Sequence, residues 1–383
     1  MSVAVSTLDG ADLLDAYQAG QSSVFVSPRG TLLAEGVHTE VNTSGLTDLT
    51  EQVAAVLGTS RHPVRTVVGA VPFAPDAPAR LVVPRRLRRA PVLGAAPTVP
   101  AASAARESLP AIPDPGYVAA VARAVEEIQA GEYTKVVLAR ALRLAAPGFD
   151  PAPVVRALAY GGAGTYTFGI DLGAGRTLLG ASPELLVSRH GRTVSANPLA
   201  GSIPRSTDPA EDARRAAGLL ESTKDLHEHT FASEAVAEGL RPFCRNLRVP
   251  SEPTLTATPT MWHLGSRITG EIIDPDVSSM ALATALHPTP AVCGTPPAAA
   301  RRAIAELEPF DRGFFAGMVG WADADGDGEW AVTIRCATAG PEGLDVYAGA
   351  GIVAASDPHA ELAETTAKLG TMLTALGVFD VAR

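Results

Sequence analysis

Three side chains near the carboxyl terminus have types and spacings that could bind charged groups together. Glu361, Glu364 and Lys368 stand at positions i, i+3 and i+7 of a predicted helix, so their side chains share one face. Asp357 is expected to cap the start of this helix. Residues 349–356, just before it, are mostly small and are predicted to form a loop with exposed backbone amides. Two carboxylates, an ammonium group and free amides suit a hard cation together with a small anion.

The same pattern has a plainer interpretation, because Glu and Lys at these spacings are common on the solvated face of a surface helix. A matching group elsewhere in the chain is Lys135, at the start of a strand predicted over residues 135–144. Its side chain falls on the same face as Val137 and Ala139. Lys135 could extend from an edge strand into solvent, or it could be a buried amine that gives up its proton easily. Spacing alone favours the first.

Acidic residues in the middle of the chain repeat the pattern. Glu184 follows Ser-Pro and is predicted at a strand entrance, because proline cannot donate a hydrogen bond to a neighbouring strand. Residues 208–240 are predicted to form a long helical region, in which Glu221, Asp225 and Glu228 lie on one side. Residues 198–202 are predicted to form a small-residue loop that lets a ligand approach the backbone closely.

Arg335 is predicted within a strand, where an unpaired guanidinium group would be costly, so it points to a binding role. Two other metal motifs fail. His227 and His229 lack the spacing of a zinc-binding HExxH segment. Residues 323–328 resemble the opening of a calcium loop, but Ile334 stands where a bidentate Glu is required. An acidic hairpin turn is the prediction for this segment.

Composition excludes several classes of function. The net charge of −10 argues against nonspecific binding to nucleic acid or to anionic lipid. The three cysteines are far apart in the sequence and odd in number. This pattern indicates small apolar core residues in a reducing compartment rather than disulfides or a zinc site. We find no signal-peptide pattern and no apolar run long enough to span a bilayer, so we expect a cytoplasmic protein. No amphipathic seam stands out, and we expect a monomer.

The chain is expected to form one unit over residues 1–383. In the amino-terminal part, residues 1–90, short strands surround one helix, and the basic segment at 80–89 is predicted to be a solvated edge strand. Residues 91–113 are rich in Ala, Pro and Ser and are predicted to form a surface linker within the fold. Residues 114–377 carry the candidate chemistry.

Taken together, ten short segments resemble the chorismate-utilising enzymes, and most of all the isochorismate synthases. The resemblance covers residues 115–377, and the segments occur in the family's order. They are residues 135–140, 180–186, 198–202, 224–229, 286–291, 306–312, 317–321, 333–336, 349–352 and 364–368. The resemblance implies an α+β fold in which antiparallel β-sheets pack as two layers, flanked by helices, with the site between them. It also implies an isomerase that uses Mg²⁺ to convert chorismate to isochorismate, adding water at C2 and expelling the C4 hydroxyl.

Residue roles follow from the resemblance position by position. Lys135 matches the general base that activates water, and Glu184 matches the general acid that protonates the leaving hydroxyl. Glu228 and Glu364 match magnesium ligands, with Asp225 and Glu361 expected to reach the ion through water. The remaining positions match residues that bind the substrate: Arg335 and the amides of Gly349 and Gly351 for its enolpyruvyl carboxylate, and Gly201, Ser202, His263, Ala291 and Lys368 for the rest.

Other functions remain open at this stage. A salicylate synthase would form isochorismate and then expel pyruvate, and an aminating relative would make anthranilate or aminodeoxychorismate. Ala291 and Phe315 stand where such relatives carry Thr and Tyr, which argues against both. A catalytically inactive binding protein would be expected to lack Lys135, Glu184 or a metal carboxylate, and none is missing. The product is expected to supply a 2,3-dihydroxybenzoate siderophore, with menaquinone or another metabolite as alternatives.

Overall fold

The computed structural model describes residues 9–94, 112–162 and 164–378. Its helices are α1 (Gly10–Asp15), α2 (Leu46–Thr59), α3 (Pro115–Gln129), α4 (Ala152–Gly161), α5 (Pro209–Glu221), α6 (Thr223–Leu240), α7 (Ser279–Leu286), α8 (Pro297–Leu307) and α9 (Pro358–Ala375). Its strands are β1 (Ser22–Ser27), β2 (Gly30–Glu40), β3 (Thr66–Val71), β4 (Arg80–Ala90), β5 (Lys135–Ala145), β6 (Tyr166–Gly173), β7 (Arg176–Ser182), β8 (Leu185–His190), β9 (Thr193–Asn197), β10 (Leu199–Pro204), β11 (Cys244–Arg248), β12 (Thr254–Ala257), β13 (Met261–Gly265), β14 (Ile268–Ile272), β15 (Gly294–Thr295), β16 (Met318–Asp323), β17 (Gly328–Val332), β18 (Cys336–Gly340) and β19 (Gly343–Ile352).

The strands form a 16-stranded sheet and a three-stranded sheet. Within each sheet, neighbouring strands pair in antiparallel orientation. The order in the large sheet is β11-β14-β9-β8-β17-β16-β3-β4-β2-β1-β6-β7-β18-β19-β5-β15. Strands from the amino-terminal part stand in its middle, where β3 pairs with β16 and β1 pairs with β6. The predicted α+β class with antiparallel sheets is therefore confirmed. Most of the predicted linker at 91–113 lies outside the described residues.

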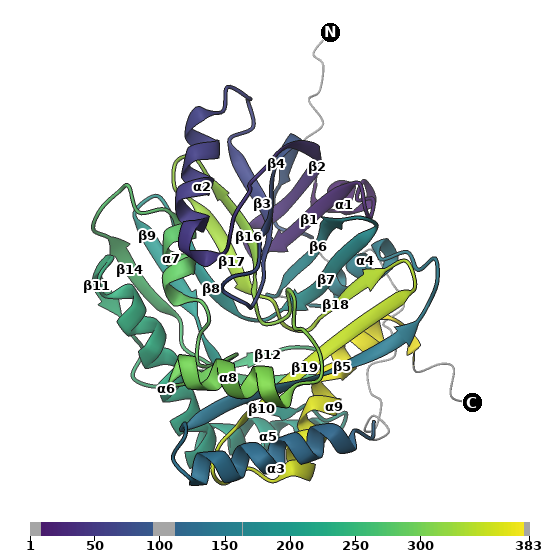
Figure 1. Ribbon diagram of the computed structural model, residues 1–383, viewed down its shortest axis with the longest axis vertical. Coiled ribbons are helices and arrows are strands. Elements are labelled where there is room, and N and C mark those ends of the chain that lie inside the picture. The colour runs from purple at the N-terminus through teal and green to yellow at the C-terminus, as the bar shows by residue number, and fades with distance from the viewer. Residues whose placement is uncertain (1–8, 95–111, 163, 379–383) are drawn as a thin grey trace.

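Helices cover the sheets on the outside, and α3, α5 and α9 gather near β5, β10 and β19 (Figure 1). The apolar side of α9 enters the core through Leu369, Met372 and Leu373, which are at most 2% exposed. Glu364 and Lys368 project from a neighbouring side of α9, where they contact Ser202 of β10 and Gly349 of β19. Burying one side of an amphipathic helix thus fixes where its polar side points.

The strand predicted to begin at Lys135 is β5, and the long helical region predicted over residues 208–240 consists of two helices. It breaks at Ser222, which ends α5 and caps α6 by accepting a hydrogen bond from the amide of Asp225. A serine hydroxyl competes well for the free amides at a helix start, which explains the break. The acidic turn at residues 323–328 does join β16 to β17 as a hairpin.

Three local predictions near the candidate site were wrong. Residues 199–202 belong to β10 rather than to a loop, with a bulge at Gly201, whose φ is +75°. Gly349 and Gly351 lie inside β19. Arg335 lies in the connection between β17 and β18, with φ at +52°, rather than in a strand. Small residues leave the choice between loop and strand to the neighbouring strands, so local sequence could not decide these cases.

Candidate active site

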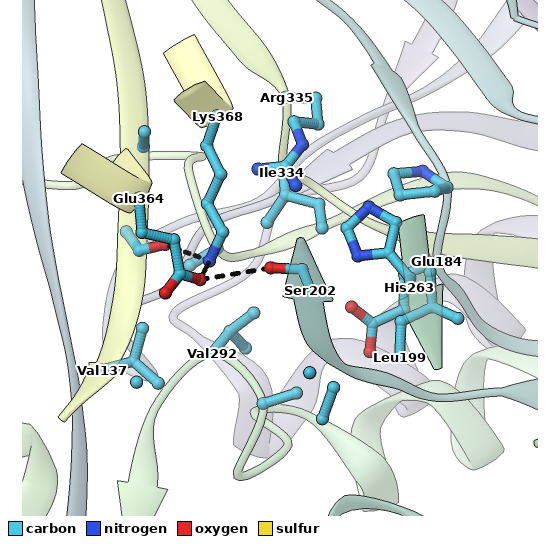
Figure 2. A pocket seen from close by; sticks show the side chains of 18 of the residues that line it. Val137, Glu184, Leu199, Ser202, His263, Val292, Ile334, Arg335, Glu364 and Lys368 are labelled. Carbon is cyan, nitrogen blue, oxygen red and sulfur yellow. Dashed lines mark hydrogen bonds and ion pairs between the residues drawn. The ribbon is translucent and has the colours of Figure 1, made fainter. Parts of the chain in front are cut away.

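One cavity collects almost all of the predicted site residues, with a volume of about 920 Å³ that includes space open to solvent. Twelve of the fourteen predicted residues line it. They are Glu184, Gly201, Ser202, Asp225, Glu228, His263, Ala291, Arg335, Gly349, Gly351, Glu364 and Lys368. Figure 2 shows Glu364 and Lys368 on one side of this cavity and Glu184 and His263 on the other. The two remaining residues, Lys135 and Glu361, lie behind the lining.

Lys135 is buried rather than extended into solvent, with 7% of its surface exposed. Its Nζ donates to Oε1 of Glu228 on α6, at 2.8 Å, and this carboxylate lines the cavity. A side chain at Gly351 would be impossible without moving this pair, because a Cβ there would lie 2.8 Å from Glu228 Oε1 and 2.9 Å from Lys135 Cε. The glycine on β19 therefore makes room for the ion pair. To accept a proton, the amine must first release the one that it shares with Glu228.

The charged side of α9 forms a second ion pair. Lys368 Nζ lies 2.7 Å from Oε1 of Glu364 and 3.0 Å from the carbonyl oxygen of Gly349, and Ser202 donates to the same carboxylate oxygen at 3.2 Å (Figure 2). Burial acts to raise the pKa of Glu364, but the charge of Lys368 and these hydrogen bonds lower it below its usual value. Glu364 is therefore an ionised, partly neutralised carboxylate.

The backbone of β19 also faces the cavity. Gly349 and Gly351 stand opposite Ala139 and Val137 of β5. Because strand residues alternate in direction, and the amide of Val137 points away from β19 to Cys293, the amides of both glycines point away from β5. The part of β19 beyond Val346 has no strand of the described chain on that side. Its amides can therefore donate to an anion in the cavity.

Glu184 lies in the short connection between β7 and β8 and is 3% exposed. Burial raises its pKa to about 8, and the nearby charges of Lys135 and Arg335 only partly oppose this. Its carboxyl group is therefore protonated at neutral pH and can donate a proton. The imidazole of His263 is equally enclosed, and burial, with the charges of Arg335 and Lys368, holds its pKa well below its usual value. His263 is a neutral hydrogen-bonding group.

Two buried polar atoms at the cavity lack hydrogen-bond partners among the described residues, namely Nε of Arg335 and Nε2 of His263. Burial lowers the pKa of Arg335 to about 10, so that its guanidinium group remains charged at neutral pH. Buried polar groups are almost always hydrogen-bonded, so unpaired ones that face a cavity are available to bind water or a ligand there. A charged donor and a neutral imidazole together suit a carboxylate next to a hydroxyl or carbonyl group.

The carboxylates predicted to bind metal lie close enough to influence one another. Burial raises the pKa of Asp225, and the charges of Glu228 and Glu364 add to this effect. Burial and the charge of Glu364 do the same for Glu361. As they stand, no three His, Cys, Asp or Glu side chains in the described part of the chain are grouped to hold a metal ion. Mg²⁺ needs only one or two protein carboxylates, however, since it keeps several waters. The donor set therefore fits magnesium in chemistry and charge.

Lys224 is a lining residue that the sequence analysis did not assign. It begins α6, one turn before Glu228, and its charge acts on Glu361 and Glu364. Unlike Lys135 and Lys368, it forms no ion pair with the described residues. The number of lysines in the sequence is a signal that could have pointed to Lys224. Of the 31 lysines and arginines, only three are lysines, at positions 135, 224 and 368. The chain uses arginine everywhere else; Lys224 and Lys368 line this cavity, and Lys135 is bonded to Glu228 in its wall.

The raised pKa of Glu184 predicts how stability changes with pH. A carboxyl group that binds its proton more tightly in the folded state contributes stability below its unfolded pKa, near 4.5, and this contribution is lost as the pH rises through about 8. The free energy of unfolding should therefore decline across this range, by at most about 1.4 kcal/mol per pH unit. Urea denaturation at several pH values should show a steeper decline for the wild type than for Glu184→Gln. Equal slopes would contradict the assignment.

Comparisons with known proteins identify the family of the chain. Residues 83–377 match the model of a family described as chorismate binding enzyme. The chain is 49% identical to isochorismate synthase DhbC of Bacillus subtilis (strain 168) over 382 residues, covering 96% of each chain. It is 44% identical to the vibriobactin-specific isochorismate synthase of Vibrio cholerae over 315 residues, covering 81% of this chain and 79% of that protein.

Among solved structures, DhbC from Bacillus anthracis superimposes with a TM-score of 0.90 at 47% identity, covering 96% of this chain and 99% of the other. The two proteins therefore share much of their sequence as well as their fold, over nearly the whole length of both chains. This length includes the strands and helices that build the cavity. The matched segment also spans every residue of the predicted site, from Lys135 to Lys368. The chain belongs to the chorismate-binding enzyme family.

Proposed function

We propose that this protein is an isochorismate synthase, which adds water at C2 of chorismate and expels the C4 hydroxyl as water. The observation that carries the proposal is that Glu184 lines the cavity and that Lys135 lies directly behind its wall, bonded to the lining residue Glu228. Lys135 belongs to β5 and Glu184 to the β7–β8 connection, and the positive charge of Lys135 acts on Glu184. The names of the similar proteins support the same reaction.

The two proton-transfer groups would act in opposite directions. Glu184, protonated at neutral pH because of its burial, would donate its proton to the departing C4 hydroxyl. Lys135 would take a proton from the water that attacks C2, after the proton shared with Glu228 has left. The overall reaction returns one water for each water consumed. It is therefore an isomerisation that needs no oxidant and no reductant.

The remaining lining residues would hold the substrate and its charges. The guanidinium group of Arg335 and the outward amides of Gly349 and Gly351 are placed for the enolpyruvyl carboxylate. Glu228 and Glu364 would hold Mg²⁺, and Asp225 and Glu361 would reach it through water. The ion would neutralise the ring carboxylate and stabilise the charge that develops during the reaction.

Product analysis tests the reaction. With chorismate and Mg²⁺ the wild type should form isochorismate, without releasing pyruvate and without dependence on ammonia. Lys135→Ala and Glu184→Gln should each lower kcat by roughly 10²–10⁴-fold, because each removes one proton-transfer group. The matched control is Glu329→Gln, a buried carboxyl group that accepts from Ser27 away from the cavity. Pyruvate release, ammonia-dependent products or near-normal rates in both variants would contradict the proposal.

The unassigned lysine gives a second, separate prediction. Lys224 lies at the exposed part of the lining, where a dianionic substrate entering an acidic protein would first meet a free positive charge. Lys224→Met should raise KM for chorismate several-fold and reduce the salt dependence of kcat/KM, with little change in kcat. Arg241→Gln, at the far end of α6, removes the same charge as a control. An equal change in the two variants would assign no special role to Lys224.

We further propose that the isochorismate supplies a 2,3-dihydroxybenzoate siderophore and that the protein acts in the cytoplasm as a monomer. The described residues contain no helix long and apolar enough to cross a membrane. The similarity to a vibriobactin-specific enzyme supports the siderophore route.

Deletion of the gene in its host tests this route. Growth should fail under iron limitation and recover when 2,3-dihydroxybenzoate is added, while menaquinone levels stay normal. A loss of menaquinone with normal growth under iron limitation would favour the other pathway.

A further inference from the structure

One edge of β5, the strand that carries Lys135, has a strand beside it only at its beginning. The two-residue β15 pairs with Lys135 and Val136, and no described strand pairs with that edge beyond this point. Val137 and Ala139 are nevertheless buried, at 6% and 3% exposure. Buried backbone groups need hydrogen-bond partners, so the edge must be satisfied in another way.

Groups outside any strand supply these partners. The amide of Val137 donates to the carbonyl oxygen of Cys293 at 2.8 Å. The carbonyl oxygen of Val137 accepts from Nη2 of Arg312 at 2.6 Å, and the amide of Ala139 donates to Oε1 of Glu308 at 2.7 Å. A donor for each carbonyl and an acceptor for each amide is what a neighbouring strand would present. Here a guanidinium group and a carboxylate provide them.

Glu308 and Arg312 are themselves a buried two-point ion pair. Arg312 donates from Nε to Oε2 of Glu308 at 2.8 Å and from Nη2 to Oε1 at 2.5 Å. Their side chains are 2% and 3% exposed. Glu308 directly follows α8, and Arg312 lies in the connection from α8 to β16. Two parallel hydrogen bonds between a guanidinium group and a carboxylate fix the relative orientation of the two side chains as well as their distance, because they allow little rotation.

Arg312 also reaches the neighbouring wall of the cavity. Its Nη1 donates to the carbonyl oxygen of Val292 at 2.9 Å. Its guanidinium carbon lies 4.5 Å from the ring centre of Phe73 and 5.7 Å from that of Phe315. Val137, Val292 and Phe315 all line the cavity, and Figure 2 shows Val137 and Val292 next to it. A single side chain therefore contacts three separate pieces of the cavity lining.

We propose that Glu308 and Arg312 are a positioning pair for the reaction, which holds β5 in register against the wall formed by Val292 and Phe315 and so sets where Lys135 stands. Neither residue touches the substrate. The inference rests on the proposed function, because Lys135 matters here as the group that takes the proton. A misplacement of the base of about 1 Å is enough to slow turnover strongly.

Kinetics of conservative variants tests the role. Arg312→Lys and Glu308→Gln keep a hydrogen-bonding group but lose the two-point geometry. Each should lower kcat by roughly 10–100-fold with KM changed less than about threefold. The solvent deuterium isotope effect on kcat should rise, because proton removal by a misplaced Lys135 becomes more rate-limiting. Arg88→Lys is the matched control, since it removes a similar fork, with Glu35 at 2.9 and 3.0 Å, between β2 and β4.

A double variant guards against loss of folding. Glu308→Leu with Arg312→Met removes both charges together and leaves no buried charge unpaired, so we expect it to fold. It should still show the low kcat, because the edge of β5 has lost its partners. A kcat within threefold of the wild type in the double variant would overturn the proposal. So would a loss of kcat in the single variants that matches their unfolded fraction with an unchanged isotope effect.

Hydrogen exchange separates this inference from the proposed function. If the wild type forms no isochorismate, the proposed function fails, yet the positioning role can still be measured. Amides in residues 136–140 should exchange at least about tenfold faster in Glu308→Gln than in Arg88→Lys, because the amide of Ala139 has lost its charged acceptor. Equal protection of these amides in both variants would contradict the positioning role.

Discussion

The antiparallel pairing of β5 with β19 is the interaction on which the cavity depends. It sets Val137 opposite Gly351 and so brings the start of one strand beside the end of another that is distant in sequence. Lys135 and Glu228 then fit against Gly351 only because this residue has no side chain. The same strand leads into α9 and places Lys368 over the carbonyl oxygen of Gly349. Any shift in this register would separate the amine, the carboxylates and the outward amides at once.

Charge balance is the second constraint, and it explains why the cavity is stable before anything binds. Buried carboxylates repel one another, as the raised pKa of Asp225 shows, where burial acts first and the neighbouring glutamates add to it. Lys135 and Lys368 each take one carboxylate, Glu228 and Glu364, as a partner. A divalent cation entering the same place would take over both roles. The lysines thus make a cluster of buried carboxylates compatible with a folded chain.

Glu184 illustrates the opposite use of burial. It has no close ion pair, so desolvation dominates and keeps its carboxyl group protonated at neutral pH. The two kinds of carboxyl group, ionised and protonated, lie on opposite sides of one cavity (Figure 2). The buried pair of Glu308 and Arg312 shows a third use of charge, since it replaces the hydrogen bonds of a missing strand. Each carboxyl group has the same chemistry, and its surroundings decide its role.

The sequence by itself determined the candidate chemistry and most of the elements. The spacing of Glu361, Glu364 and Lys368 fixed one polar helix face, because helical periodicity is local. Ordered motifs also identified the family and therefore the cavity residues. Tertiary structure alone decided that Lys135 is buried, that Arg335 leaves the strand and that Gly349 and Gly351 belong to β19. These features depend on strands that are distant in sequence, so no local pattern could encode them. The partners of Arg312 likewise emerged only when the folded chain brought separate segments together.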